Sequence, residues 1–448
     1  MRILAATAVV LTLTASAAPA VAADGTGTDG LWRMDGYGTV VALGHGTYQE
    51  YQTTSISCLK GDSARQTGPW TYEADGTVVT VRPGHDRDHA SLSADSSVGH
   101  RRLHRITALP AACTHPSPQD PRTTFDVFWQ SFEENYPFFA AKGVNWQAAR
   151  DRYRPLIHPG TTRAQLFDIF GRMVRPLHDA HVVVQDGDRY YGVGRPGTEI
   201  PSEELDTKVK RFIVARDLKN ATTRRDFAEG RITYAELPDS ATGYLRISTF
   251  SGYDTKDRSY AADLAELDRA LSAVLARPPH GLIIDLRVNG GGSDALGIHI
   301  AERLTDKPYI AYSKRARNDP TDPTHHTRPE PIVVTPAPGP RYTGPIAVLT
   351  GGSTVSAGET FTQALIDRPY RTVRIGQPTQ GVFSDVMNRK LPNGMVAWLP
   401  NEEYLNRTGH TYDGTGIPPR ITEPVFTEKE FAENRDSAFD RAITSLRR

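Results

Sequence analysis

One short apolar run ends in glycine and small polar residues directly before a helical pattern, and this order strongly constrains the fold. Residues 345–350 are apolar and β-branched, which predicts a buried strand. Residues 351–359 (GGSTVSAGE) turn the chain, and residues 360–365 have helical spacing. Ser356 is therefore expected at a helix N-terminus, where free N–H groups and the helix dipole stabilise negative charge. A serine nucleophile needs this setting, although a plain helix N-cap is the alternative.

A second segment has the same construction. Residues 281–292 (GLIIDLRVNGGG) form an apolar run that ends in Asp285, Arg287 and Asn289 and continues into three glycines, before a predicted helix over 293–304. Three glycines indicate a close approach or a positive φ. A phosphate-binding loop fits poorly, because neither the spaced-glycine pattern nor a Gly-Lys-Ser/Thr ending is present. A plain glycine-rich turn remains open as an alternative.

Together the two segments resemble the tail-specific (C-terminal processing) peptidase family. Residues 285–292 match its Asp-Leu-Arg-x-Asn-x-Gly-Gly loop, and residues 356–359 match its Ser-Ala-x-Glu nucleophile loop. The resemblance implies an α/β crotonase-like (ClpP-like) protease core of stacked βα units over about residues 241–425. It also implies hydrolysis of peptide bonds by Ser356.

The general base separates two branches of this family. In the Ser/Lys branch a lysine lies in a Gly-Lys-Gly-x-x-Gln element, which corresponds here to residues 376–383 (GQPTQGVF). Val382 stands where that lysine is expected. Lys390 is the nearest lysine downstream, and no motif supports it. We therefore reject a Ser/Lys dyad.

The other branch resembles the core of the tricorn protease and uses a histidine in a Leu-x-Asp-x-His element. Residues 177–181 read LHDAH, which makes His181 the expected base, with Ala180 where relatives have Ser or Gly. A neutral imidazole can accept the serine proton near neutral pH. His178 and His181 could instead bind a metal, but no third ligand with zinc-like spacing is present. Neither a metal nor an organic cofactor is expected.

A histidine base needs a third group to orient it. In the tricorn-like branch an acid precedes a Gly-Val/Ile-x-Pro element, and residues 412–419 (YDGTGIPP) place Asp413 there. Glu359 is the rival acid, and Asp413 as an ordinary turn residue stays open. By resemblance, the oxyanion hole is expected from the backbone N–H groups of Gly290 or Gly291 and of Ala357, because glycine permits close approach of two donors.

Composition limits the partners. The 448 residues predict two or three domains, and 52 basic residues balance 52 acidic ones. No basic stripe is interleaved with aromatic residues, so nucleic acid is excluded as a partner. The expected partner is a protein or peptide substrate. Cleavage preference and oligomeric state do not follow from the sequence.

The first 22 residues predict a secretory signal peptide. Arg2 supplies positive charge, residues 3–13 are apolar, and residues 20–22 (AVA) form a small-x-small cleavage site before Ala23. A membrane anchor is the alternative, but the run is short for a span, and no later segment is long enough. A secreted, extracellular protein follows. In an oxidising compartment Cys58 and Cys113 could form one disulfide.

Pattern changes along the chain predict its organisation. Residues 29–115 predict a small β domain, and residues 122–185 a helical domain with an aromatic stripe that carries His181. Residues 186–240 are expected to be an irregular linker, and residues 241–448 the catalytic core. Within that core, residues 307–342 are expected to form a surface excursion and residues 427–448 one amphipathic helix.

The resulting hypothesis is a secreted serine endopeptidase. Ser356 attacks the peptide carbonyl, His181 accepts its proton, Asp413 orients His181, and an acyl-enzyme forms and is hydrolysed. A non-catalytic ligand- or peptide-binding protein on the same scaffold is the alternative, because a fold does not determine a function. Esterase activity of the same residues is a third hypothesis.

Overall fold

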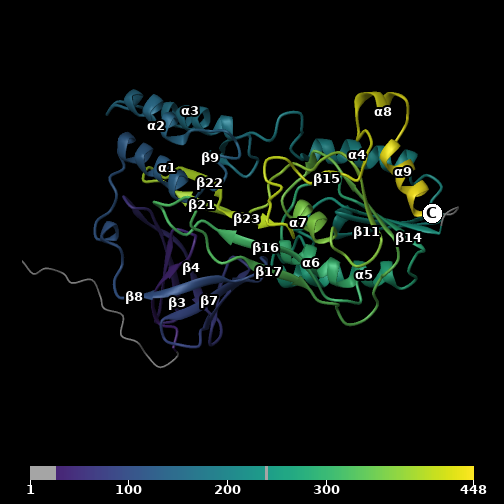
Figure 1. The fold of residues 1–448 in the computed structure, drawn as a ribbon, viewed down its shortest axis with the longest axis horizontal. Helices are drawn as coiled ribbons and strands as arrows, with labels where there is room; N and C mark the ends of the chain where they lie inside the picture. Colours follow the sequence, from purple (N-terminus) through teal and green to yellow (C-terminus); the bar gives the residue numbers. More distant parts are fainter. Residues whose placement is uncertain (1–26, 238–240, 448) are drawn as a thin grey trace, which may run out of the picture.

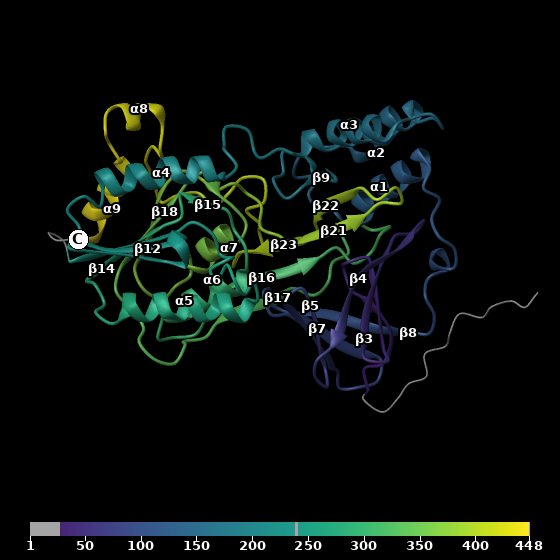
Figure 2. The same cartoon turned by 180° about the vertical axis from the view of Figure 1, so that it is seen from behind.

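The computed structural model describes residues 27–237 and 241–447 (Figure 1). A β-barrel lies at one end of the molecule and an α/β unit at the other (Figures 1 and 2). Helices α1–α3 lie at the same end as the barrel. The signal peptide predicted over residues 1–22 lies outside the described residues. In the part of the chain that is described, no helix combines the length and the apolar character needed to cross a bilayer.

The N-terminal β domain is a closed barrel of eight antiparallel strands. Its strands are β1 (Gly30–Met34), β2 (Thr39–Gly44), β3 (Thr47–Thr53), β4 (Cys58–Gln66), β5 (Thr71–Ala74), β6 (Thr77–Pro83), β7 (His89–Ala94) and β8 (Arg101–Ile106). Alternation directs Trp32, Val81 and Leu103 into the barrel, where they are fully buried. The expected disulfide is confirmed: Cys58 of β4 is bonded to Cys113 of the 3-10 helix η1 (Ala111–Cys113).

The helical segment packs on a small sheet and places His181 at the junction. The helices are α1 (Pro121–Asn135), α2 (Trp146–Tyr153), η2 (Arg154–Leu156), α3 (Arg163–Val174) and η3 (Arg175–Leu177). The predicted aromatic stripe is core: Phe125, Phe128 and Phe132 are fully buried. The sheet beneath has the order β10-β9-β22-β21, formed by β9 (Val183–Asp186), β10 (Arg189–Gly192), β21 (Val386–Lys390) and β22 (Val396–Pro400). Two of these strands come from the C-terminal third, so the helices are joined to the core.

A seven-stranded sheet in the order β11-β12-β13-β14-β18-β20-β24 forms the centre of the α/β unit. Its strands are β11 (Thr223–Phe227), β12 (Ile232–Leu237), β13 (Thr242–Ile247), β14 (Gly281–Asp285), β18 (Ile346–Thr350), β20 (Thr372–Gly376) and β24 (Ile421–Thr422). The strands from β13 to β24 are parallel, whereas β11, β12 and β13 pair antiparallel. The structure therefore has an α/β core preceded by a β domain.

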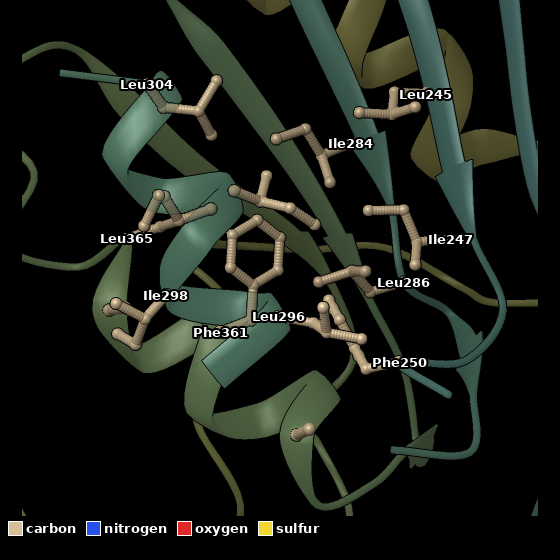
Figure 3. Close-up of a cluster of buried hydrophobic side chains, with 14 of the residues drawn as sticks. Leu245, Ile247, Phe250, Ile284, Leu286, Leu296, Ile298, Leu304, Phe361 and Leu365 are labelled. Carbon is tan, nitrogen blue, oxygen red and sulfur yellow. The ribbon is translucent and has the colours of Figure 1, made fainter. Parts of the chain in front are cut away.

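Helices cover both faces of this sheet. Helices α5 (Tyr260–Leu275), α6 (Asp294–Arg303) and α7 (Ala357–Ala364) bury their apolar side chains with Leu245 and Ile284 on one face. Figure 3 shows Phe361 of α7 pointing into this cluster. On the other face, α4 (Glu203–Arg216) and α9 (Ser437–Leu446) pack in a second cluster. Apolar layers on both faces explain why the central parallel strands read as continuous apolar runs.

Residues 186–240 are not the irregular linker that was expected. They contain β10, α4, β11 and β12, and two of these are strands of the central sheet. Only Val209 and Ile213 of α4 are buried, and its other positions are largely polar or charged. A helix with so narrow an apolar stripe resembles a charged loop in sequence.

Residues 307–342 are likewise not a surface excursion. Strands β16 (Tyr309–Ala316) and β17 (Glu330–Val334) join β23 (Glu402–Leu405) in a three-stranded sheet between the barrel and α7. The buried Lys314 ammonium lies 3.4 Å from Asp385 and 3.1 Å from Glu402. The Pro-, His- and Thr-rich composition indicated a surface segment, whereas the burial of Lys314 with its two carboxylate partners depends on tertiary contacts.

The C-terminal segment forms two helices rather than one. Helix α8 (Glu428–Ala432) ends before Asn434, whose φ of 48° is incompatible with a continuing helix, and α9 begins after Asp436. The Asp436 carboxylate accepts a hydrogen bond from Phe439 N–H and caps α9.

Candidate active site

Ser356 lies at the corner between the central sheet and α7. The chain leaves β18, forms the two-residue strand β19 (Ser353–Thr354) and enters α7 directly after Ser356. The backbone of Ser356 has φ 56° and ψ −122°, outside the regions that L-residues readily adopt. Ser356 O accepts a hydrogen bond from Glu359 N–H at 2.7 Å, and the Glu359 carboxylate accepts one from Ser356 N–H at 3.3 Å. A strained residue of this kind, held by its surroundings, is typical of functional sites.

The glycine loop lies directly against Ser356. The two-residue strand β15 (Val288–Asn289) pairs in parallel with β19, which brings residues 290–292 beside the nucleophile turn. A Cβ on Gly291 would lie 2.5 Å from Ser356 Cβ, and Gly291 has φ 80°. The buried Asn289 amide holds the loop: it donates to Ile247 O at 2.8 Å and accepts from Gly291 N–H at 2.9 Å. The glycines therefore serve close approach, as expected.

The three predicted oxyanion donors differ in their availability. Gly290 N–H donates to Ser248 O at 2.9 Å, and Gly291 N–H donates to Asn289 Oδ1 at 2.9 Å. Ala357 N–H, by contrast, has no acceptor among the residues that the structure describes. Gly292 N–H also lacks one there, and Gly292 is exposed. In this conformation Ala357 and Gly292 are the donors free to bind an oxyanion, and the sequence had not singled out Gly292.

The charged side chains of the glycine segment pair with the start of the C-terminal helix rather than with Ser356. The fully buried Arg287 guanidinium lies 2.7 Å from Asp285 and 2.6 Å from Asp436. Its Cζ atom also lies 4.1 Å from the centre of the Phe426 ring. Asp285 and Arg287 thus tie the end of β14 to the C-terminal helix α9.

Glu359 joins α7 to the loop that follows β20. Its carboxylate accepts hydrogen bonds from Gly381 N–H at 2.6 Å, Val382 N–H at 2.9 Å and Ser356 N–H at 3.3 Å. Ser356 N–H also faces Val382 O at 3.2 Å. Burial raises the pKa of Glu359 to about 8, against the hydrogen bonds that it accepts. Glu359 therefore holds the backbone around Ser356.

His181 enters the site from the helical segment. His178 has φ 47° and turns the chain out of η3. His181 and Val182 are the two residues directly before β9. His181 N–H donates to Asp179 Oδ1 at 2.9 Å, and Asp179 Oδ2 accepts from the Tyr136 hydroxyl at 2.8 Å. The buried Asp179 thereby fixes the backbone at His181 through local and tertiary bonds.

The surroundings of the imidazole favour its neutral form. Burial lowers the pKa of His181, the nearby Asp179 and Asp385 carboxylates oppose this effect, and Lys142 lowers the pKa further. His181 Nδ1 is buried and has no hydrogen-bond partner in the described part of the chain. A neutral imidazole is the form that accepts a proton.

Asp413 lies beside the same loop as Ser356. Its carboxylate accepts from the Thr411 hydroxyl at 2.5 Å and from Phe383 N–H at 3.3 Å. Burial raises the pKa of Asp413 well above its usual range, and the charges of Asp179 and Glu359 add to the increase. Asp413 thus lies within electrostatic reach of Asp179, the carboxylate that fixes the His181 backbone. Within the described residues no hydrogen bond joins Asp413 to the imidazole of His181.

The loop 381–385 connects the predicted site residues. Val382 contacts Ser356, Phe383 contacts Asp413, and the charge of Asp385 acts on His181. Across the described chain, no hydrogen bond joins the Ser356 hydroxyl to His181. The sequence had no signal for Asp385 or for Tyr136, since neither lies in a motif.

A cavity of about 520 Å³ lies on another side of the nucleophile turn. Its lining includes Arg195, Thr198, Gly352 and Ser353. The Arg195 guanidinium donates to Gln380 O at 3.0 Å, and Ser353 donates to Glu199 O at 2.7 Å. The segment before α4 therefore braces both the nucleophile turn and the loop that carries Val382.

The described residues contain no group of three His, Cys, Asp or Glu side chains arranged to hold a metal ion. His178 is exposed whereas His181 is buried, so the two histidines do not present a common face. The chemistry that the arrangement can perform uses a hydroxyl, an imidazole and backbone donors.

This arrangement, a serine at a strand-to-helix corner against a glycine loop, defines a hydrolase-type α/β protein. Residues 241–422 match peptidase family S41, and residues 117–175 match the tricorn protease C1 domain. The match over residues 241–422 is to the family whose two motifs the sequence resembles.

Known relatives agree with this family. A carboxyl-terminal-processing protease of Synechocystis is 26% identical over 257 residues, which are 56% of this chain and 51% of that protein. The carboxy-terminal processing protease CtpA of Bacillus subtilis is 24% identical, with 48% of this chain and 42% of that protein covered. The chain thus spans about half, or less, of the length of these curated relatives.

Among solved structures, a candidate peptidase from Parabacteroides merdae has a TM-score of 0.60 at 24% identity. The match covers 73% of this chain and 97% of that one. Mature CPAF has a TM-score of 0.54 at 13% identity, covering 73% and 96%. At these identities the likeness concerns the fold alone.

Proposed function

We propose that the chain is a serine endopeptidase with a crotonase-like (ClpP-like) core, in which Ser356 is the nucleophile. One observation carries this proposal: Ser356 has a strained backbone at the N-terminus of α7, within contact of the glycine loop. That corner supplies what an oxyanion needs, namely unpaired N–H groups at the positive end of a helix. The match of residues 241–422 to peptidase family S41 supports peptide-bond hydrolysis as the reaction.

The proposed reaction begins with attack of Ser356 Oγ on a peptide carbonyl carbon. His181 accepts the hydroxyl proton as the C–O bond forms, and the negative charge on the carbonyl oxygen is bound by Ala357 N–H and the glycine loop. His181 then donates the proton to the leaving amine as the C–N bond breaks. Water hydrolyses the acyl-enzyme with His181 again as base.

In our proposal, Asp413 supports this cycle through its position in the protein. It holds Phe383 beside the nucleophile loop and faces Asp179, which fixes His181. The imidazolium that forms during acylation is stabilised by the charge of Asp179, which raises the pKa of His181. Glu359 is assigned to the backbone around Ser356 rather than to the triad, because three N–H groups already bind its carboxylate.

The substrate class and compartment are part of the proposal. The substrate is a protein or peptide, since this is the chemistry of the family. Export is supported by the signal-like first 22 residues and by the Cys58–Cys113 disulfide, which persists in oxidising compartments. The functional units are the barrel over 29–115, the helical unit over 122–185 and the core, which includes β11 and β12 and therefore begins before residue 241.

A binding protein without catalysis is the second candidate. One observation favours it: two of the expected oxyanion donors, Gly290 and Gly291, are engaged within the protein. A binding protein would keep those hydrogen bonds, whereas an enzyme would use the free donors or rearrange the loop.

A fluorophosphonate probe distinguishes these candidates. The wild-type chain is expected to be labelled and Ser356→Ala is not, while His181→Ala labels at least about a hundredfold more slowly because the base is lost. Ser63→Ala, an exposed serine of β4, serves as the control and should label normally. Hydrolysis of unfolded casein and of an ester, measured on the same variants, separates peptidase from esterase activity. Equal labelling of wild type and Ser356→Ala would reject the nucleophile.

A further inference from the structure

Among the contacts between the barrel and the α/β unit, two reach segments that lead to the proposed site. Both contacts come from the loop between β7 and β8. Ser96 O accepts a hydrogen bond from the Ser293 hydroxyl at 2.7 Å, and the Ser97 hydroxyl donates to Asp385 Oδ2 at 2.6 Å. Neighbouring residues of one barrel loop therefore hold two separate segments of the core.

The first contact reaches the glycine loop. Ser293 directly follows Gly292, and its hydroxyl also accepts from Leu296 N–H at 3.3 Å to cap α6. Ser293 N–H donates to Phe250 O at 2.9 Å. The barrel carbonyl thus helps to hold the end of the loop that touches Ser356.

The second contact reaches the loop that connects the predicted site residues. Asp385 follows Val382, which faces Ser356 N–H, and Phe383, which binds Asp413. Besides Ser97, the Asp385 carboxylate faces Arg101 of β8 at 3.3 Å and Lys314 of β16 at 3.4 Å. Two of its three side-chain partners therefore belong to the barrel.

Asp385 also lies within electrostatic reach of the proposed base. The charged groups that act on His181 are Asp179 on its own segment, Lys142 from the helical unit and Asp385 from the core. Asp179 is held by Tyr136, whereas Asp385 is held by the barrel. The barrel is thus placed to set the field at the imidazole from one side.

We infer that Ser97 is a positioning residue of the proposed hydrolase, acting through Asp385 on His181 and on the loop beside Ser356. The barrel is then a part of the active site and not a separate binding module. This inference rests on the proposed function. It adds to that function a role for a domain that lies outside the stretch matching family S41.

The test measures the rate constant for fluorophosphonate labelling of the full chain across about pH 5 to 9, around the ordinary histidine pKa. Ser97→Ala removes the hydroxyl that donates to a carboxylate, and labelling is expected to slow about tenfold. Ser97→Thr keeps the hydroxyl and should restore the rate. Ser93→Ala on β7 is the matched control, because the Ser93 hydroxyl makes no hydrogen bond in the described part of the chain.

The pH profile separates positioning from general stability. Asp385 raises the pKa of His181, so loosening or neutralising that carboxylate should move the acid limb of the profile to lower pH. Asp385→Asn is expected to show the same shift. Because Ser97 acts through Asp385, the double variant should be no slower than Asp385→Asn alone.

The inference would be overturned if Ser97→Ala kept the wild-type labelling rate and the wild-type acid limb of the pH profile. It would also be overturned if the effects of Ser97→Ala and Asp385→Asn on the rate added up in the double variant. Either result would leave Ser356 as the nucleophile. If circular dichroism shows that Ser97→Ala does not fold, Asp385→Asn decides alone: an unshifted acid limb rejects the role. Absence of labelling in the wild type would instead contradict the proposed function.

Discussion

Ser356 and Gly291 form one steric unit, since each has a positive φ and the two lie in contact. The side chain of Ser356 can occupy its corner only because Gly291 lacks a Cβ. Neighbouring Gly290 differs: a Cβ there would meet no atom within 4 Å, and its φ is not positive. Two adjacent glycines of one motif therefore have different roles, which the motif alone does not distinguish.

Gly291→Ala should impair Ser356 much more than Gly290→Ala does. The new Cβ would lie 2.5 Å from Ser356 Cβ, so the serine must move. Displacement by about 1 Å lowers reactivity roughly a hundredfold, and we expect that loss in fluorophosphonate labelling. Gly290→Ala should label within a few fold of wild type. Equal effects of the two substitutions would contradict the steric assignment.

Helix α9 is fastened to the end of strand β14 by a buried ion group. Arg287 lies between Asp285 and Asp436, all of them with side chains no more than 2% exposed. Asp436 has two functions, since it also caps α9. The C-terminal helix therefore stabilises the strand that leads into the glycine loop.

Asp436→Asn separates these two functions. Asparagine caps helices about as well as aspartate, so the cap is kept while one partner of Arg287 is lost. Removing one partner of a buried pair should lower the free energy of unfolding by about 3 kcal/mol. Urea denaturation measures this loss. Arg441→Ala, which breaks the partly exposed pair with Glu423, should change stability by about 0.5 kcal/mol or less; a similar loss in both variants would contradict the proposed role.

Buried carboxyl groups of the α/β unit with raised pKa values affect the stability of the whole molecule. Burial raises the pKa of Glu359 and of Asp217 to about 8 and that of Asp294 to about 7. These groups bind protons more tightly in the folded chain than in the unfolded chain. Their contribution to stability is therefore complete below the unfolded pKa values and is lost as pH rises through 7 to 8.

The unfolding temperature is accordingly expected to be higher near about pH 5 than near about pH 8. Asp217→Asn should reduce this difference. The buried Asp217 faces the negative Asp436 and has one carboxylate oxygen without a hydrogen-bond partner among the described residues. Calorimetry of both proteins at the two pH values provides the measurement. An equal fall in wild type and variant would show that Asp217 does not carry this effect.

Much of the central fold was predictable because its signals are local. The apolar runs before Ser356 and before Gly290 form β18 and β14, and the aromatic stripe after residue 122 forms α1. The disulfide followed from there being only two cysteines in the sequence. By contrast, β16 and β17 were missed because the Pro-, His- and Thr-rich composition of residues 307–342 indicated a surface segment, whereas Lys314 of β16 is buried through its distant partners Asp385 and Glu402.

Local patterns were enough to place a serine at a strand-to-helix corner, to predict a glycine loop beside it and to indicate the family that residues 241–422 match. Hydrophobic periodicity and backbone restrictions act over a few residues and can be read in order along the chain. Which N–H groups stay free, what holds His181, and how the barrel loop reaches Asp385 were decided only by folding. These features depend on contacts between residues far apart in sequence, and no short-range pattern records such contacts.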